Sequence, residues 1–519
     1  MKKTFTRSLF LSALLFAACN DPDGHGPHEP ISLFTQIDEI QLVGGETAAE
    51  ISAYDSKTKR LFVINAVKPA IDVINMEDPF NLTYESEISI TAYGHGVTSV
   101  SVKNGLLAAA IESNPKTDPG KVVVWDTETM AEKAVVTVGS LPDMVTFSPD
   151  GSYLVTANEG EPNEDYSVDP NGSVSIINVK QNYSVTTLDF TPFNSQTQSL
   201  LSKGYRLPGP TGITLAADTE PEYLTISHDN KTAWVTLQEN NGIAKVNLKN
   251  KVIEKIFPLG FLDHRLPGNE LDPSDKDNGL FFGNHPVKGI FMPDGIASYA
   301  SGGTNYLVTV NEGDSRIRPT SDEALPPYEE GDLFNEESRI GDVVLDPVKF
   351  PNAAALQAED KLGRLKITNR MGDTDGDGDY DELYTFGTRS FTIWNGNTGA
   401  RVFDSGHKLE NFLISELPGR YDDARSDDKG AEPENVAVGK IGSRTIAFLG
   451  IERADVVMVV DVTNPNAPIF VQALPTGDAP EGILFIKGSD SPNKRSTLVV
   501  SCEGNGKVNV FQMSGPEKE

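Results

Sequence analysis

The stretch Glu481–Met513 reads EGILFIKGSDSPNKRSTLVVSCEGNGKVNVFQM, and it decides the fold. Its three short apolar runs, separated by turn-forming residues, predict three β-strands. Earlier units of the same kind carry a fourth strand. The missing strand is found at 35–51, where TQIDEIQLVGGETAAEI resembles PIFVQALPTGDAPEGI at 468–483. We therefore expect an N-terminal strand to complete the last unit, which is how a ring of sheets closes without a free edge.

Four-stranded units of about 45 residues recur along the rest of the chain. Clear copies begin at Asp143, Glu222, Asp294 and Glu434, and weaker copies begin near Glu50 and Thr98. With the last unit these make seven copies. The 46 glycines and 33 prolines also favour a protein rich in strands and turns. The sequence predicts an all-β fold, a seven-bladed β-propeller whose ring is closed by an N-terminal strand that completes the last blade.

The chain is strongly acidic, with 75 Asp and Glu residues against 44 Lys and Arg and a formal net charge of −31. Such a surface repels phosphate backbones and attracts cations, so nucleic-acid binding is excluded. The two cysteines are Cys19 and Cys502. Because Cys19 is the expected lipidation site, no disulfide is expected. We expect a monomer.

The N-terminus has the features of a lipoprotein signal. Three basic side chains lie within residues 2–7, a short apolar run follows at 9–16, and small residues precede Cys19. This run is too short to span a bilayer, which favours a signal peptide over a transmembrane helix. The expected organisation is a signal peptide over 1–18, lipidation of Cys19, a flexible tether over 19–32 and the propeller over 33–519. The protein is then attached by its lipid to the outer membrane or cell surface, outside the cytoplasm; an ordinary secretory signal is the alternative.

Acidic residues recur at two places in the units. First strands begin with an acid in six of the seven units, and second strands end with one in six. The first set is Glu50, Asp143, Glu222, Asp294, Glu434 and Glu481, and the second is Glu112, Glu159, Glu239, Glu312, Glu452 and Glu503. Both strand ends lie on one face of a propeller, so these carboxylates should surround one mouth of its channel. They either accept hydrogen bonds from strand ends and neighbouring blades, or they require cations because so many like charges repel.

The most specific motif is DTDGDGDYDEL at 373–383. Its spacing assigns Asp373, Asp375, Asp377 and Asp381 as side-chain ligands and the Asp379 carbonyl as a fifth, with Gly378 allowing a sharp turn. Oxygen ligands suit a hard cation, so calcium is the expected cofactor. Position twelve is Tyr384 instead of Glu, and no strong helices flank the motif, which favours a structural calcium loop over a switch. An acidic, solvated turn is the alternative.

Further candidates lie at the acidic strand ends. Glu159, Glu312, Asp314 and Glu503 are candidate ligands for a second metal ion or a cationic ligand at the channel mouth. Near them, Arg316, Arg389 and Arg453 either pair with a phosphate or carboxylate ligand or neutralise the acids. Insertions at 182–221, 261–292 and 314–384 should rise from this same face. Long loops on one face of a rigid scaffold are where binding sites usually lie.

Five phrases together resemble one family of exported proteins. They are ANEGEPNEDY at 157–166, VNEGDSR at 310–316, GTRSFTIWN at 387–395, AEPENVAVG at 431–439 and DVTNPNAPIF at 461–470. This set resembles the choice-of-anchor I family of β-propeller proteins over most of the chain. The resemblance implies surface attachment, here through Cys19, and kinship with calcium-dependent, propeller-type alkaline phosphatases and phytase-like esterases. On that kinship the four acids of the channel mouth are implied as metal ligands, and Arg316 or Arg389 as the group that holds phosphate.

Three functions are left open at this point. The first is an anchored propeller that binds a surface ligand or partner on its acidic face and carries structural calcium. The second is a metal-dependent phosphoesterase acting on a phosphorylated small molecule, in which metals would polarise the phosphate and activate water. The third is a purely structural envelope protein. No zinc spacing, Walker loop or nucleophile elbow is present in the sequence.

Overall fold

Seven four-stranded antiparallel sheets contain most of the strand residues among the described residues. The structure is a computed structural model, and it describes residues 33–318 and 334–514. In five sheets four consecutive strands lie in chain order, and in a sixth the order is β20-β21-β27-β28, with an insertion between β21 and β27. In the seventh sheet the N-terminal strand β1 lies beside β35. The chain is thus an all-β protein with the sheets of a β-propeller.

The first three sheets consist of β2 (Ser52–Asp55), β3 (Arg60–Asn65), β4 (Ala70–Asn75) and β5 (Thr83–Ser89); β6 (Val97–Lys103), β7 (Leu106–Ile111), β8 (Pro119–Asp126) and β9 (Glu132–Ser140); and β10 (Pro142–Phe147), β11 (Tyr153–Asn158), β12 (Ser173–Asn178) and β13 (Ser184–Asp189). The next two consist of β14 (Leu224–Ile226), β15 (Thr232–Leu237), β16 (Gly242–Asn247) and β17 (Val252–Pro258); and β20 (Ile296–Ser301), β21 (Thr304–Val310), β27 (Phe391–Asn395) and β28 (Arg401–Asp404). The last two consist of β29 (Pro433–Ile441), β30 (Arg444–Ile451), β31 (Val456–Asp461) and β32 (Ile469–Pro475); and β33 (Pro480–Ile486), β34 (Thr497–Cys502), β35 (Lys507–Met513) and β1 (Phe34–Gln41).

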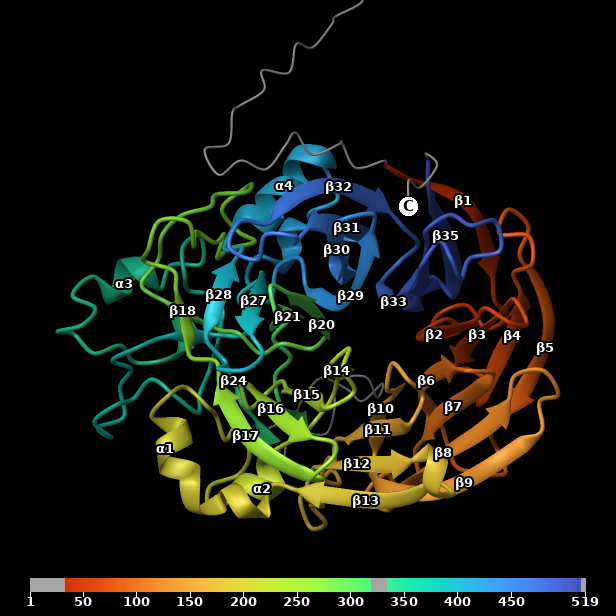
Figure 1. The fold of residues 1–519 in the computed structure, drawn as a ribbon. Coiled ribbons are helices and arrows are strands. Elements are labelled where there is room, and N and C mark those ends of the chain that lie inside the picture. Colours follow the sequence, from red (N-terminus) through yellow and green to blue (C-terminus); the bar gives the residue numbers. More distant parts are fainter. Residues whose placement is uncertain (1–32, 319–333, 515–519) are drawn as a thin grey trace, which may run out of the picture. The chain divides into compact units, whose positions relative to one another are not determined.

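The first strands of successive sheets lie against one another. β2 contacts β6, β6 contacts β10, β10 contacts β14, β14 contacts β20, β20 contacts β29, β29 contacts β33, and β33 contacts β2. Figure 1 shows these first strands innermost, with β5, β9 and β13 at the outside. Second and third strands are covered on both faces by neighbouring sheets, so their apolar runs are buried throughout, as in the VVMVVD segment of β31.

The N-terminal strand β1 is tied to two sheets. It pairs antiparallel with β35, with Phe34 opposite Met513 and Gln41 opposite Lys507. The ring of Phe34 is 1% exposed and packs edge-on against Phe448 of β30, with ring centroids 5.3 Å apart. The Gln472 side chain of β32 accepts a hydrogen bond from the Phe34 N–H and donates one to its carbonyl, both at 2.9 Å.

Four insertions interrupt the succession of sheets. The first, between β13 and β14, contains η2 (Thr191–Gln196), α1 (Thr197–Leu201) and α2 (Leu215–Asp218), and the second, between β17 and β20, contains β18 (Phe261–Asp263) and β19 (Lys288–Ile290). The third, between β21 and β27, contains β22 (Ile317–Arg318), β23 (Phe334–Asn335), β24 (Glu337–Arg339), η3 (Ile340–Asp342), α3 (Ala353–Leu356), β25 (Lys366–Thr368) and β26 (Tyr384–Thr385). The fourth, between β28 and β29, contains α4 (Lys408–Glu416) and η4 (Asp423–Arg425). Short 3₁₀ turns η1 (Val179–Gln181), η5 (Glu452–Ala454) and η6 (Glu503–Asn505) follow strands of the sheets. The sequence predicted the first three insertions and missed the one that contains α4.

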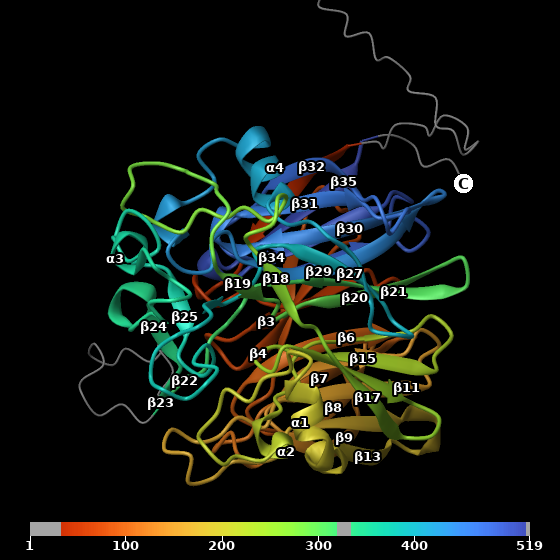
Figure 2. The ribbon, with the colours of Figure 1, turned by 90° about the vertical axis from the view of Figure 1, so that its left-hand side faces the viewer.

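The second and third insertions share a small core of their own. β19 pairs with β18 and, in parallel, with β26. Leu271 from the second insertion is buried with Ile340, Leu362 and Ile367 from the third. Figure 2 shows α3 and β22–β25 gathered on one side of the sheets.

Several sequence predictions concern residues that the structure does not describe. The signal peptide over 1–18, the lipidation site Cys19 and the tether over 19–32 all lie outside the described residues. Among the described residues, Cys502 is a buried free thiol. Among the described residues, no helix has both the length and the apolar character needed to cross a membrane.

The packing of β1 gives a first prediction. Phe34→Ala removes a ring that is 1% exposed, so we expect the free energy of unfolding to fall by about 3 kcal/mol or more. The neighbouring change Leu33→Ala, at a side chain that is 50% exposed, should cost less than about 0.5 kcal/mol. Denaturant unfolding of both variants checks this. Equal losses at the two positions would show that β1 is not anchored by Phe34.

Candidate functional site

The acids at the starts of the first strands lie at irregular backbone positions. Asp143, Glu434 and Glu481 each fall where the pairing of a first strand with its second strand shifts register. Such a bulge leaves a residue unpaired in the ladder and re-aims its side chain. In the unit without an acid the same position is Thr98, and its hydroxyl donates to the Pro142 carbonyl of the next sheet.

A strained turn precedes four of these acids. Leu141, Met292, Glu432 and Ala479 have positive φ values of 43°, 45°, 53° and 52°. Each is followed by a proline and then by the acid. Non-glycine residues rarely adopt this conformation, and it costs of order 1 kcal/mol or more at each position. Its repetition in four units shows that the turn is a fixed part of how the acids are presented.

The same turns bring the acids of the second strands to the first. The N–H of Glu159 donates to the Leu141 carbonyl at 2.8 Å. The N–H groups of Glu452 and Glu503 donate in the same way to Glu432 and Ala479, both at 2.9 Å. We call the first-strand acids (Glu50, Asp143, Glu222, Asp294, Glu434 and Glu481) the inner ring and the second-strand acids (Glu112, Glu159, Glu239, Glu312, Glu452 and Glu503) the outer ring.

The inner-ring carboxylates are partly buried and repel one another. Burial, and then the charges of Glu503, Asp143 and Glu112, raise the pKa of Glu50 to about 8. Burial, and then Glu161, raises the pKa of Asp143 to about 7. Burial followed by repulsion from neighbouring acids also raises the pKa values of the other four members, Glu222, Asp294, Glu434 and Glu481, well above their usual range. Within the described residues, no hydrogen bond or ion pair reaches any of the six carboxylates.

The outer ring, in contrast, is partly neutralised by bases from the insertions. Lys429, in the loop after α4, places its ammonium 2.5 Å from Glu312 Oε1 and 3.2 Å from Asp314 Oδ1. The other oxygen of Glu312 accepts from Gln238 Nε2 at 2.8 Å. Arg453 lies 2.8 Å from Glu452. The chain thus supplies its own cations to this ring.

The four acids predicted for the channel mouth do not form one ligand set. Glu312 and Asp314 share Lys429, whereas the pKa of Glu159 is raised by burial and then by Glu161 and Glu220. Among the described residues, the compact carboxylate groups at this rim join Glu312 either to Asp294 and Glu434 or to Glu432 and Glu452. Glu159 and Glu503 belong to neither group.

The arginines of the rim are committed to protein partners. The Arg316 side chain is fully buried, with Nη1 2.7 Å from Asp218 Oδ1 and Nη2 2.7 Å from Glu220 Oε2. Arg389, 4% exposed, donates to the carbonyls of Asp272 and Ser426 at 2.8 and 2.7 Å. These contacts fit the neutralising alternative for Arg316 and argue against phosphate binding by either residue.

Several residues of this network were missed by the sequence reasoning. They are Asp218 and Glu220 in the first insertion, Lys429 and Glu432 beyond α4, and the buried pair Arg206–Glu336. None belongs to a spaced motif. The sequence offered one hint, namely that basic residues lie in the insertions of an otherwise acidic chain and would be attracted to the acids.

The predicted calcium loop is compact and exposed. Asp373 accepts hydrogen bonds from the N–H groups of Gly376 and Gly378, at 2.7 and 3.0 Å. Oxygens of Asp373, Asp375 and Asp381 lie within 4.8 Å of one another. Repulsion, first from Asp377, raises the pKa of Asp375. Gly376 and Gly378, with φ values of 82° and 98°, make the turn that this proximity requires.

Two members of the loop differ from the sequence prediction. Asp379 was predicted to use its carbonyl, but its side chain groups with Asp381 and with Asp346, an acid outside the motif. Asp377 belongs to neither group, and its carboxylate accepts from the Asp379 N–H at 3.1 Å. Asp346 is brought in by the bridge between Leu345 and Tyr380, which no sequence spacing reveals.

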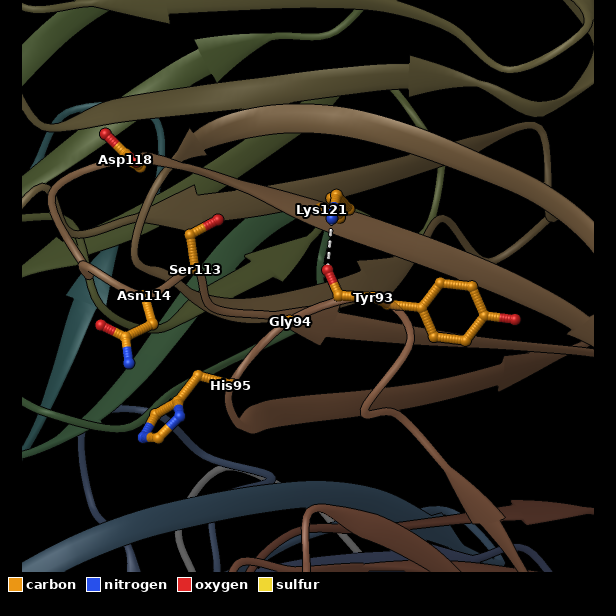
Figure 3. A pocket seen from close by; sticks show the side chains of 7 residues that line it. All are labelled: Tyr93, Gly94, His95, Ser113, Asn114, Asp118 and Lys121. Atoms are coloured by element: carbon orange, nitrogen blue, oxygen red, sulfur yellow. Dashed lines mark hydrogen bonds between the residues drawn. The ribbon is translucent and has the colours of Figure 1, made fainter.

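A polar pocket of about 320 Å³ adjoins the outer ring. Figure 3 shows its lining residues, Tyr93, Gly94, His95, Ser113, Asn114, Asp118 and Lys121. The N–H of His95 donates to the Glu112 carbonyl at 2.9 Å, which places the pocket next to that acid. Lys121 donates to the Tyr93 carbonyl and Ser113 to the Pro119 carbonyl, whereas the Tyr93 ring points away (Figure 3).

The sheets and the acidic rim together define a β-propeller with one chemically specialised end. Residues 50–465 match the choice-of-anchor I domain, and the chain belongs to that family. Domains of this family are typically extracellular or surface-associated.

Individual proteins are more distantly similar. Gigasin-3a of Magallana gigas is 26% identical over 193 residues, which cover 31% of this chain and 68% of that protein. Among solved structures, the hydrazine synthase of Kuenenia stuttgartiensis is 12% identical, with a TM-score of 0.46 over 90% of this chain and 96% of that one. The β-propeller domain of Cps50 (Swd1) from Myceliophteria thermophila is 9% identical, with a TM-score of 0.44 over 92% and 99%.

The raised pKa values predict an unusual dependence of stability on pH. Folded Glu50 releases its proton near pH 8 and folded Asp143 and Glu452 near pH 7, whereas unfolded carboxyls do so near pH 4. The folded state therefore holds more protons between these limits, so its stability must fall as pH rises from about 5 to 8. With chelator present, we expect the melting temperature to drop by about 5 °C or more over this range.

Thermal melts at constant ionic strength check this. Glu50→Gln should flatten the curve, whereas Glu85→Gln, which removes an exposed acid of β5, should not. A melting temperature that is constant or rises across the range would contradict the electrostatic description of the inner ring.

Proposed function

We propose that this protein is a lipid-anchored, extracytoplasmic β-propeller of seven blades that binds a ligand or partner on its acidic, insertion-bearing face and carries structural calcium. One observation carries the proposal: the insertions meet at the acidic rim. Arg316 of the third insertion pairs with Asp218 and Glu220 of the first, and Lys429 of the fourth pairs with Glu312. Long loops gathered at one end of a rigid scaffold are the usual setting of a binding site.

The seven-bladed ring is supported by two features of the sheets. First strands contact one another in succession, and β33 contacts β2. The pairing of β1 with β35 gives the last sheet four strands from both ends of the chain. Such an arrangement leaves no sheet with a missing strand and favours closure of the ring.

The phosphoesterase alternative has less support than binding. It needs an arginine to hold the phosphate, and Arg316 and Arg389 are occupied by Asp218, Glu220 and backbone carbonyls. A purely structural role is less favoured because side chains of three insertions gather at the rim of carboxylates. We therefore favour a binding protein.

Anchoring is tested by changing Cys19. In the full-length chain, Cys19→Ala should move the protein from the membrane fraction to the soluble extracytoplasmic fraction, because a thioether-linked lipid can no longer form. Metabolic labelling with a fatty acid should mark the parent chain and not the variant. A parent chain that incorporates no fatty acid, or a Cys19→Ala chain labelled as strongly as the parent, would refute the anchor.

Structural calcium is tested at the loop. Asp375 is exposed, so Asp375→Asn should leave the fold intact and remove a ligand. We expect calcium to raise the melting temperature of the parent chain by an amount equivalent to about 2–3 kcal/mol at saturating concentration, and to raise that of Asp375→Asn less. The matched control is Asp165→Asn, at an exposed acid of another loop. An identical calcium response in all three proteins would rule out the loop site.

A further inference from the structure

A hollow of about 270 Å³ lies between the first and third insertions. Its wall consists of four apolar or aromatic side chains and two arginines: Leu201, Tyr205, Arg206, Leu207, Arg370 and Met371. None of these residues is acidic, although the chain carries 75 acids against 44 bases. Basic groups beside an apolar surface fit an organic anion and do not fit a cation.

Arg370 is the cation of this wall that a ligand can reach. Its side chain is exposed, and within residues 33–318 and 334–514 no carboxylate pairs with it. Its Nη2 donates to the Gly209 carbonyl at 2.7 Å, and the guanidinium lies 5.5 Å from the centroid of the Phe334 ring. A guanidinium has five N–H donors, so most of them are left to pair with an anion.

The carbonyl that holds Arg370 is itself fixed by the buried network of the rim. The Gly209 N–H donates to Asp218 Oδ1 at 2.7 Å, and the same oxygen lies 2.7 Å from Arg316 Nη1. A Cβ at position 209 would stand 2.2 Å from that oxygen, so any side chain there would displace the Asp218 carboxylate. The guanidinium is therefore positioned before a ligand arrives, which lowers the entropic cost of binding.

The wall contributed by the first insertion is rigid. Tyr205 is 1% exposed, and its hydroxyl shares a hydrogen bond with the Thr219 hydroxyl at 2.6 Å, so the tyrosine contributes its ring. Arg206 is 2% exposed and its charge is paired with Glu336. The Arg206 Nε is buried and has no hydrogen-bond partner among the described residues. An unpaired buried donor is costly, and a ligand oxygen at this wall would supply the acceptor that it lacks.

We propose that the hollow binds a small monocarboxylate with an apolar body, such as a medium-chain fatty acid. The carboxylate pairs with Arg370, and the apolar body lies against Leu201, Leu207 and Met371. A single negative charge suits the one accessible guanidinium, whereas a doubly charged phosphate is repelled more strongly by a chain of net charge −31. The inference names a ligand class for the insertion-bearing end of the protein, and in that respect it rests on the proposed binding function.

The test titrates octanoate into the full chain by isothermal calorimetry. All proteins carry Cys19→Ala, so that neither the lipid nor a detergent competes for the hollow. We expect saturable binding of octanoate. Octanol should bind about tenfold more weakly or worse, because it cannot form a charge-assisted pair with Arg370. Octylammonium, which has the opposite charge, should bind no better than octanol.

Variants locate the binding. Arg370→Gln should weaken octanoate binding about tenfold or more and leave octanol binding unchanged, because only the pairing with the charged head is lost. The matched control is Arg401→Gln, since Arg401 is also exposed and lies over a phenylalanine ring, that of Phe291. It should bind octanoate as its parent does. Met371→Gln, which makes the wall more polar, should weaken octanoate and octanol alike.

Three results would overturn the proposal: no saturable binding of octanoate, octanol bound as tightly as octanoate, or equal octanoate affinity in Arg370→Gln and Arg401→Gln. If Arg370→Gln folds poorly, unchanged octanoate binding by Met371→Gln overturns it as well. A failed titration removes this ligand class and leaves the lipid anchor and the calcium loop standing, because fatty-acid labelling and the calcium response test those separately.

Discussion

Carboxylates that face one another inside a protein repel, and this repulsion organises the acidic end of the propeller. Two unit charges about 4 Å apart interact with about 4 kcal/mol at the effective dielectric of a partly buried site. The outer ring meets the problem with bases: Lys429 and Arg453 lie against Glu312, Glu432 and Glu452. No ion pair of the described residues joins a base to the inner ring, and burial with mutual repulsion raises the pKa values of its carboxyls. The insertions thus supply basic side chains that partly neutralise the outer-ring carboxylates, besides covering the sheets.

The same unusual backbone conformation recurs at four equivalent positions of this arrangement. Residues with positive φ, such as Leu141 and Ala479, recur before a proline and an acid. Strain that recurs at equivalent positions is characteristic of functional sites. Here its effect is to present a first-strand acid next to a second-strand acid in several blades, through hydrogen bonds such as that from Glu159 to Leu141.

The sequence predicted the repeating strands well because period-two patterns and turn residues are local signals. It also placed the acids at strand ends, since repetition made them visible. It missed α4, whose segment lies in a stretch of mixed composition between two strands. It could not predict that Lys429 reaches Glu312 or that Asp346 joins the loop, because these contacts depend on how distant insertions fold over the rim. Contacts between side chains of different loops do not recur at a fixed spacing, so no pattern in the sequence predicts them.

The central claim is that carboxyls of the inner ring hold protons in the folded chain near neutral pH. Unfolding the chelator-treated protein at pH 7 in an unbuffered solution, and measuring the base needed to hold the pH constant, tests this directly. Protons should be released as the chain unfolds, because unfolded carboxyls ionise near pH 4, and the release should shrink at pH 9. Unfolding at pH 7 without proton release would contradict the account.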